Sequence, residues 1–275
     1  MDGVLLFLLT ILLSLVVVLL LFVGFFKFMF EPAFILIFKR PVFLYWYPIP
    51  KKLNQHQRQI LEKEFSFYRK LSDKKKTYFE HRVKSFLLTY KFVGNEIVVT
   101  NDVRIIIAGT YVMLTFGMRN YLVPLFNKII VYPTVYYSTI TEHYHKGEFN
   151  PRLKAVVFSW EDFVSGHQVT NNNINLGLHE FSHVLHFHAL KGKDSSAIIF
   201  YDEFMEVIKY YNDAGLNAQL NQKAYFREYA YENQFEFLSV LLEHFFETPH
   251  IFKAEFPDLF QSVRRMINFD EKLLC

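Results

Sequence analysis

The residues with the clearest chemistry are His179-Glu180-Phe181-Ser182-His183, which form an H-E-x-x-H motif. On a helix, residues four positions apart share a face, so the imidazoles of His179 and His183 can bind one metal ion. Glu180 stands one residue further along, where its carboxylate can accept a proton from a water molecule at that ion. The motif therefore predicts zinc-dependent hydrolysis, with two histidine ligands and Glu180 as the general base.

A catalytic zinc ion takes three protein ligands and leaves its fourth position to water. The residue six positions after His183 is Ala189, so a third histidine ligand at that spacing is excluded. The other source is an acidic residue on a later helix, and the helix predicted over residues 232–249 carries Glu236 and Glu243. These glutamates are two helical turns apart, and spacing alone does not choose between them.

A helix must carry the motif, and the flanking sequence predicts one. Apolar residues recur around it at helical spacing, and Asn171–Asn173 are available to cap its first turn. The apolar residues are Ile174, Leu178, Phe181, Leu185 and Phe187.

The rest of the chain alternates between helical and β-like segments. Residues 53–92 and Val103 to Phe116 are predicted as helices, and residues 95–100, 128–137 and 154–162 as strands. Helices followed by a small sheet and more helices indicate an α+β fold with an antiparallel or mixed sheet. The strand at 154–162 precedes the metal helix, so we expect it to form an edge on which an extended substrate pairs its backbone.

The N-terminal segment has a different composition. Val4 to Phe26 are 23 residues interrupted only by Thr10, Ser14 and Gly24, long enough to cross a bilayer as a helix. Basic residues follow this span and only Asp2 precedes it, so the positive-inside rule places the remainder of the chain in the cytoplasm. These basic residues are Lys27, Lys39, Arg40, Lys51 and Lys52.

Three regions follow from this composition. We expect a transmembrane anchor over residues 1–30, an interfacial and linker segment over 31–52, and a zinc-dependent catalytic domain over 53–275. Tyr45, Trp46 and Tyr47 suit the headgroup region of a membrane. The protein is thus predicted as a single-pass membrane protein with its catalytic domain on the cytoplasmic side.

Composition excludes several other classes of protein. The chain has 275 residues, of which 52% are hydrophobic, which excludes intrinsic disorder. Its formal net charge is only +3, so no nucleic-acid partner is expected. The lone cysteine, Cys275, excludes an intramolecular disulfide.

Beyond the motif, the chain resembles the Mlc titration factor A family of zinc-dependent peptidases over about residues 53–270. Four blocks occur in the family's order: IIVYP at 129–133, VVFSWED at 156–162, LHEFSHVLH at 178–186, and the run from Phe235 to Phe260. The resemblance implies a zincin-like catalytic core similar to the protease domain of anthrax lethal factor.

The resemblance also implies roles for residues outside the motif. It makes Glu236 the third zinc ligand and Glu243 the later acid of the family pattern. Glu243 is expected either to support a histidine ligand or to be a solvated acid on the helix face. It places a tyrosine seven residues before the third ligand, where Tyr229 stands and could donate a hydrogen bond to the oxyanion. The result is a gluzincin-like zinc (Zn2+) metallopeptidase acting on peptides or proteins, and both aminopeptidase and endopeptidase action stay open.

The chain departs from this family in two respects. The relatives implied by the resemblance lack an N-terminal anchor, and the Asp-Pro pair expected before the third-ligand helix is replaced by Glu232-Asn233. Asn233 can still cap a helix. The alternative function is a membrane-tethered protein that sequesters a cytoplasmic transcriptional regulator, with zinc in a structural role, since some relatives bind a repressor. A structural zinc site does not require Glu180, so this alternative leaves that residue without a role.

Overall fold

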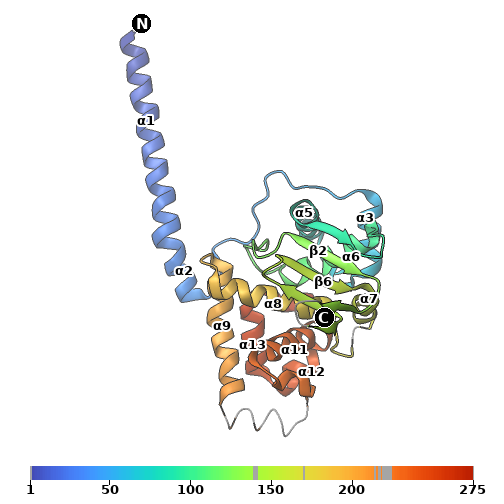
Figure 1. Ribbon diagram of the computed structural model, residues 1–275. Coiled ribbons are helices and arrows are strands. Elements are labelled where there is room, and N and C mark those ends of the chain that lie inside the picture. The colour runs from blue at the N-terminus through green and yellow to red at the C-terminus, as the bar shows by residue number, and fades with distance from the viewer. Residues whose placement is uncertain are drawn as a thin grey trace. The chain divides into compact units, whose positions relative to one another are not determined.

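The computed structural model describes residues 2–138, 142–169, 171–213, 215, 218 and 225–274, and Cys275 lies outside them. Figure 1 shows the chain as a ribbon. It divides into two units, Met1–Phe43 and Leu44–Cys275, and each is described by itself.

Most of the first unit is one long helix made of three segments. Helix α1 (Asp2–Phe25) continues through a π-helical turn, η1 (Phe26–Phe30), into α2 (Glu31–Phe38). Pro32 has no N–H and its ring crowds the preceding turn. In that turn the Glu31 N–H bonds to the carbonyl of Phe26, five residues back.

The helix is longer than the sequence analysis predicted. Residues Gly3–Phe38 form 36 helical residues that are long and apolar enough to cross a membrane. At 1.5 Å per residue they extend about 54 Å, well beyond the roughly 30 Å of a bilayer's hydrocarbon core. The segment after residue 30, which was predicted to be interfacial, continues the helix up to Phe38 because a proline is tolerated in the first turn of a helix.

The second unit begins with a segment that packs on its own folded body. The Tyr45 hydroxyl donates to the carbonyl of Phe116 at 2.8 Å, and its ring lies 4.9 Å from the guanidinium of Arg82. The fully buried Arg82 also donates from Nε to the Tyr47 hydroxyl at 2.8 Å. Tyr45 and Tyr47 were predicted to face lipid headgroups. They pack on the protein instead, because a buried guanidinium attracts aromatic faces.

The sheet of this unit has four strands in the order β1-β2-β6-β5. Strands β1, β2 and β6 are parallel, and β5 runs antiparallel to β6, so the sheet is mixed. The strands are β1 (Lys91–Gly94), β2 (Lys128–Tyr132), β5 (Gly147–Asn150) and β6 (Ala155–Ser159). The predicted α+β class with a small mixed sheet is confirmed.

Two strand predictions need correction. The strand expected at 95–100 lies at 91–94, because the chain bends after Gly94 and, within the described residues, the β-branched residues that follow pair with no strand. The strand expected at 154–162 is β6, which is central rather than an edge strand because β2 and β5 pair with its two sides. The edge nearest the metal motif belongs to β5.

A two-stranded ribbon covers part of one sheet face. Strands β3 (Tyr136–Ser138) and β4 (His143–His145) pair antiparallel. Tyr136 packs against Ala155 and Val157 of β6 in a small separate cluster. The predicted strand 128–137 thus consists of β2 and the first residues of β3, with Pro133 between them.

Most other elements of the second unit are helices, which lie before, at and after the motif in the sequence. The helices before it are α3 (Gln55–Glu64), α4 (Ser66–Arg69), α5 (Asp73–Thr89), α6 (Asn101–Leu114) and α7 (Trp160–Gln168). The later elements are α8 (Leu176–Lys191), α9 (Ser195–Asn212), η2 (Glu228–Tyr231), α11 (Gln234–Glu247), α12 (Pro249–Glu255), α13 (Pro257–Met266) and η3 (Glu271–Leu273). Helix α6 matches the predicted buried helix closely.

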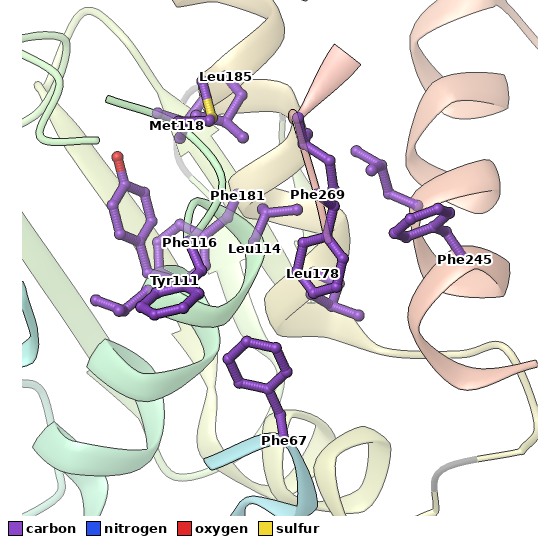
Figure 2. Close-up of a cluster of buried hydrophobic side chains, with 14 of the residues drawn as sticks. Phe67, Tyr111, Leu114, Phe116, Met118, Leu178, Phe181, Leu185, Phe245 and Phe269 are labelled. Atoms are coloured by element: carbon purple, nitrogen blue, oxygen red, sulfur yellow. The ribbon is translucent and has the colours of Figure 1, made fainter. Parts of the chain in front are cut away.

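The hydrophobic core positions α8. Leu178, Phe181 and Leu185 on its inner face are buried, and Figure 2 shows them among Tyr111 of α6 and other large apolar side chains. Phe245 of α11 lies on the far side of the same cluster (Figure 2). Helix α8 contacts the sheet through β5 and β6 and also packs on α11 (Figure 1). The core therefore holds the metal motif between the sheet and α11.

Candidate metal centre

The motif lies in the first turns of α8, whose start is set by Asn175. The Asn175 side chain accepts a hydrogen bond from the Leu178 N–H at 3.0 Å, the usual geometry of an N-cap. The cap was predicted among Asn171–Asn173, two or more residues too early. Ile174, predicted on the apolar helix face, precedes the helix and is 56% exposed.

Three candidate ligands converge in the second unit. The ligand atoms of His179, His183 and Glu236 all lie within 4.8 Å of one another. His179 Nε2 is 3.2 Å from His183 Nε2 and 3.0 Å from Glu236 Oε2. The structure thus brings together the three residues that the sequence analysis predicted as ligands.

Glu236 comes from the start of α11, and the helix cap explains its position. The Asn233 side chain accepts hydrogen bonds from the N–H groups of Phe235 and Glu236, at 2.9 and 3.1 Å. Asn233 therefore performs the capping role expected of it, and it places Glu236 in the first turn of α11, facing α8.

Glu243 lies two turns further along α11, behind His179. The Nδ1 atom of His179 is 2.8 Å from Glu243 Oε1, and Glu243 is 1% exposed. With Nδ1 carrying the proton, the Nε2 lone pair of His179 faces the other candidate ligands. Burial lowers the pKa of His179, but the carboxylates of Glu236 and Glu243 outweigh it and raise this pKa, so a metal ion must displace the proton on Nε2 before that nitrogen can act as a ligand. Glu243 thus orients a histidine instead of joining the cluster.

Arg227 completes this arrangement, and no sequence motif pointed to it. Its two terminal nitrogens donate to Glu243 Oε2 at 2.7 Å and Oε1 at 2.8 Å, a bidentate pair. Burial alone would raise the pKa of Glu243, yet hydrogen bonds from His179 and Arg227 hold it below its usual value. Arg227 also donates to the carbonyl of Asn173, so it joins α11 to the loop that precedes α8.

Glu180 is buried and lines a cleft. Burial raises the pKa of its carboxyl to about 7, the charge of His179 lowers it, and the charge of Glu236 raises it again. A Cβ at Gly147 of β5 would lie 2.8 Å from Glu180 Cγ and 2.9 Å from Oε1. Glycine at this position therefore allows the β5 backbone to lie directly against the Glu180 side chain.

Tyr229 lies in η2, on the same side of the cluster as Glu236. Its ring centre is 5.7 Å from that of His179, and its hydroxyl is hydrogen-bonded to the Glu236 carboxylate. Tyr229 is 40% exposed and lines the cleft. Both Glu180 and Tyr229 thus lie beside the ligand cluster, as the sequence analysis expected.

The cleft beside these residues has a volume of about 420 Å³. Its walls come from β4, β5, α7, the loop before α8, and η2. His179, Glu180 and Tyr229 are among the residues that line it. A volume of this size is typical of ligand-binding clefts.

The donor set fits a zinc ion. Two imidazole nitrogens and one carboxylate are the ligands of many catalytic zinc sites. Glu236 Oε2 is buried without a hydrogen bond of regular geometry, although it faces the histidine nitrogens. A cation between these atoms would give the carboxylate oxygen Oε2 of Glu236 the partner that it lacks.

Comparisons with known proteins agree with this geometry. The model of the family described as glucose-regulated metallo-peptidase M90 matches residues 49–267. An uncharacterized protein of Synechocystis sp. is 24% identical over 250 residues, which cover 82% of this chain and 88% of that protein. The family match confirms the resemblance to the Mlc titration factor A peptidases.

Proposed function

Because the chain belongs to the glucose-regulated metallo-peptidase M90 family, we propose that it is a zinc-dependent peptidase anchored to a membrane by its N-terminal helix. The observation that carries the proposal is the convergence of His179, His183 and Glu236 beside Glu180 in an open cleft. Membership of the family makes the chain a metallopeptidase-type protein that uses a metal ion.

The proposed ligands are His179, His183 and Glu236. When bound, zinc would supply Lewis acidity that makes water a nucleophile near neutral pH. Glu180 accepts the proton of the attacking water on its carboxylate and then passes it to the nitrogen of the leaving amine. Burial raises the pKa of this carboxyl, whereas a zinc ion beside it would favour the carboxylate form that accepts the proton.

Tyr229 is proposed to stabilise the transition state. Its hydroxyl can donate a hydrogen bond to the carbonyl oxygen of the substrate as negative charge develops there. The pKa of this phenol is raised well above its usual value, mainly by burial and also by the nearby charge of Glu236. The hydroxyl therefore keeps its proton throughout the reaction.

The substrate backbone is proposed to pair with β5. In the described part of the chain, the outer edge of Gly147–Asn150 has no strand partner. An extended peptide that adds to this edge would pass beside Gly147 and Glu180. This replaces the role that the sequence analysis gave to β6.

The side of the membrane follows from the charged residues at the ends of the helix. Lys27, Lys39 and Arg40 lie toward its C-terminal end, and only Asp2 lies toward the other end. We therefore place the catalytic unit on the cytoplasmic side.

The test is Glu180→Gln in the full-length protein, purified in detergent and loaded with zinc. We expect one zinc per chain, measured by mass spectrometry of the metal, in both the wild type and the variant. Hydrolysis of a mixed peptide library should fall by at least about 100-fold in the variant, because a positioned general base contributes 10²–10⁴-fold. Glu206→Gln, a substitution on the exposed face of α9, is the matched control and should keep full activity.

Two results would count against the proposal. Full activity of Glu180→Gln would remove Glu180 from the reaction. A wild-type protein that binds zinc but cleaves no peptide would favour the alternative, a tethered protein that binds a cytoplasmic regulator.

A further inference from the structure

We propose that the cleft beside the metal centre selects a substrate with a large, uncharged apolar side chain next to the scissile bond. This inference rests on the proposed peptidase function and names the chemistry that the site prefers. It follows from three properties of the residues that line the cleft: the pairing of their charges, the exposure of their apolar side chains, and the attachment of the loop that carries Ile174.

The charges in the walls of the cleft are already paired with each other. Lys146 Nζ lies 2.7 Å from Asp162 Oδ1, and the other oxygen of Asp162 accepts from the Ser159 hydroxyl at 2.6 Å. Arg227 and Glu243 form the second pair. The remaining carboxylate that lines the cleft is Glu180, the proposed base. Within the described lining, a charged substrate side chain would therefore have to displace one of these pairs or occupy Glu180, the group that the proposed reaction needs.

Apolar surface is exposed between these pairs. Ile174, Leu176, Tyr144 and Tyr229 line the same cleft as Glu180. Ile174 is 56% and Tyr144 is 73% exposed, which is high for large side chains beside a candidate catalytic residue. Tyr144 is supported from the side by the ring of Tyr137, with centroids 5.3 Å apart. Surface of this kind in a cleft marks a site for an apolar ligand group.

Ile174 is held in the cleft by a loop with many attachments to α11. The N–H of Asn173 donates to Glu247 at 2.7 Å, and the Thr248 hydroxyl donates to the Asn173 side chain at 2.7 Å. Asn173 itself adopts a left-handed backbone conformation, with φ of 55°. Its attachments to α11 keep the exposed isoleucine in one position, which lowers the entropy cost of binding a substrate group.

The expected preference follows from desolvation. An apolar side chain gains free energy by covering Ile174 and Tyr144, while a charged one loses water without finding a partner. Discrimination by an apolar pocket is typically 10–200-fold for a single group. We therefore expect at least about 10-fold higher kcat/KM for leucine or phenylalanine than for aspartate or lysine at the selected position.

The test uses the zinc-loaded full-length protein and a peptide library varied at each position around the cleavage site, read by mass spectrometry. We expect leucine, isoleucine, phenylalanine and methionine to be enriched at one position adjacent to the cleaved bond. Ile174→Asp should remove this enrichment and improve the relative rate for lysine at that position. Ile251→Asp is the matched control, since Ile251 is 55% exposed on α12 and does not line the cleft.

A second measurement does not depend on turnover. Matched peptides with leucine or aspartate at the selected position are titrated against zinc-loaded Glu180→Gln, and the leucine peptide should bind at least about 10-fold more tightly. Cleavage without side-chain preference, or a preference for charged residues, overturns this inference and leaves the peptidase function intact. Absence of any cleavage contradicts the peptidase function, and the titration alone then decides whether the cleft prefers apolar groups.

Discussion

The pairing of Arg227 with Glu243 gives the sharpest prediction about the stability of the metal centre. We expect Arg227→Met to destabilise the second unit, because it leaves the carboxylate of Glu243 buried with only the His179 Nδ1–H and the Asn175 N–H as donors. Methionine keeps the approximate length of the side chain, so the change mainly removes charge and hydrogen bonds.

The size of the effect follows from the burial of the two partners. Removing one member of a fully buried ion pair costs about 3–5 kcal/mol. The Arg227 side chain is 31% exposed and that of Glu243 is 1% exposed, so water offsets part of the loss. We expect a loss of about 2–3 kcal/mol, which corresponds to a Tm about 5–10 °C lower for a unit of this size.

The assay is thermal unfolding of the full-length protein in detergent with a chelator present, so that metal binding does not contribute. Adding Glu243→Gln to Arg227→Met should recover at least half of the lost stability, because the unpaired charge is then gone. Lys209→Met is the control, since Lys209 and Glu206 form a surface pair with about half of each side chain exposed, worth less than about 1 kcal/mol. The reasoning is refuted if Arg227→Met lowers Tm no more than the control, or if the second substitution adds a further loss.

Two further predictions concern the surroundings of the cleft. Burial raises the pKa of Glu247 to about 7, so the folded state holds a proton between about pH 4.5 and 7 that the unfolded state releases, and stability falls as the pH rises through this window. Glu247→Gln keeps an acceptor for Asn173 and should raise Tm at pH 8 but not at pH 4.5; an equal change at both pH values would contradict the argument. Gly147→Ala places a Cβ 2.8 Å from Glu180 Cγ, so kcat should fall at least about 10-fold while zinc content stays at one per chain, and unchanged kcat would show that β5 does not position Glu180.

The sequence was informative where a pattern is local and repeats with the period of a helix. The spacing of His179 and His183 predicted a shared helix face, and Asn233 predicted the start of α11. Spacing alone could not separate Glu236 from Glu243, because two helical turns return a side chain to nearly the same face. The packing of α11 on α8 separates them by placing Glu236 at Nε2 of His179 and Glu243 at Nδ1.

Features that depend on contacts between distant segments were missed. The sequence GEFN of β5 has little strand propensity, and it becomes a strand because β6 pairs with it. Because β5 was not predicted, β6 was taken for an edge strand. Arg227 follows no motif, and its role appears only when the chain brings it to Glu243, sixteen residues away. The one sequence feature that could have pointed to Arg227 is that a basic residue stands two positions before Tyr229.

The buried Arg82 and its tyrosines have a consequence for how the protein searches for substrates. From Tyr45 onward the chain is held on the second unit, so only residues 39–44 separate that unit from the end of α2. Six residues reach at most about 20 Å. If the helix spans a membrane as proposed, this short connection limits the second unit to substrates that come within its reach of that membrane surface, which favours polypeptides held in the same membrane.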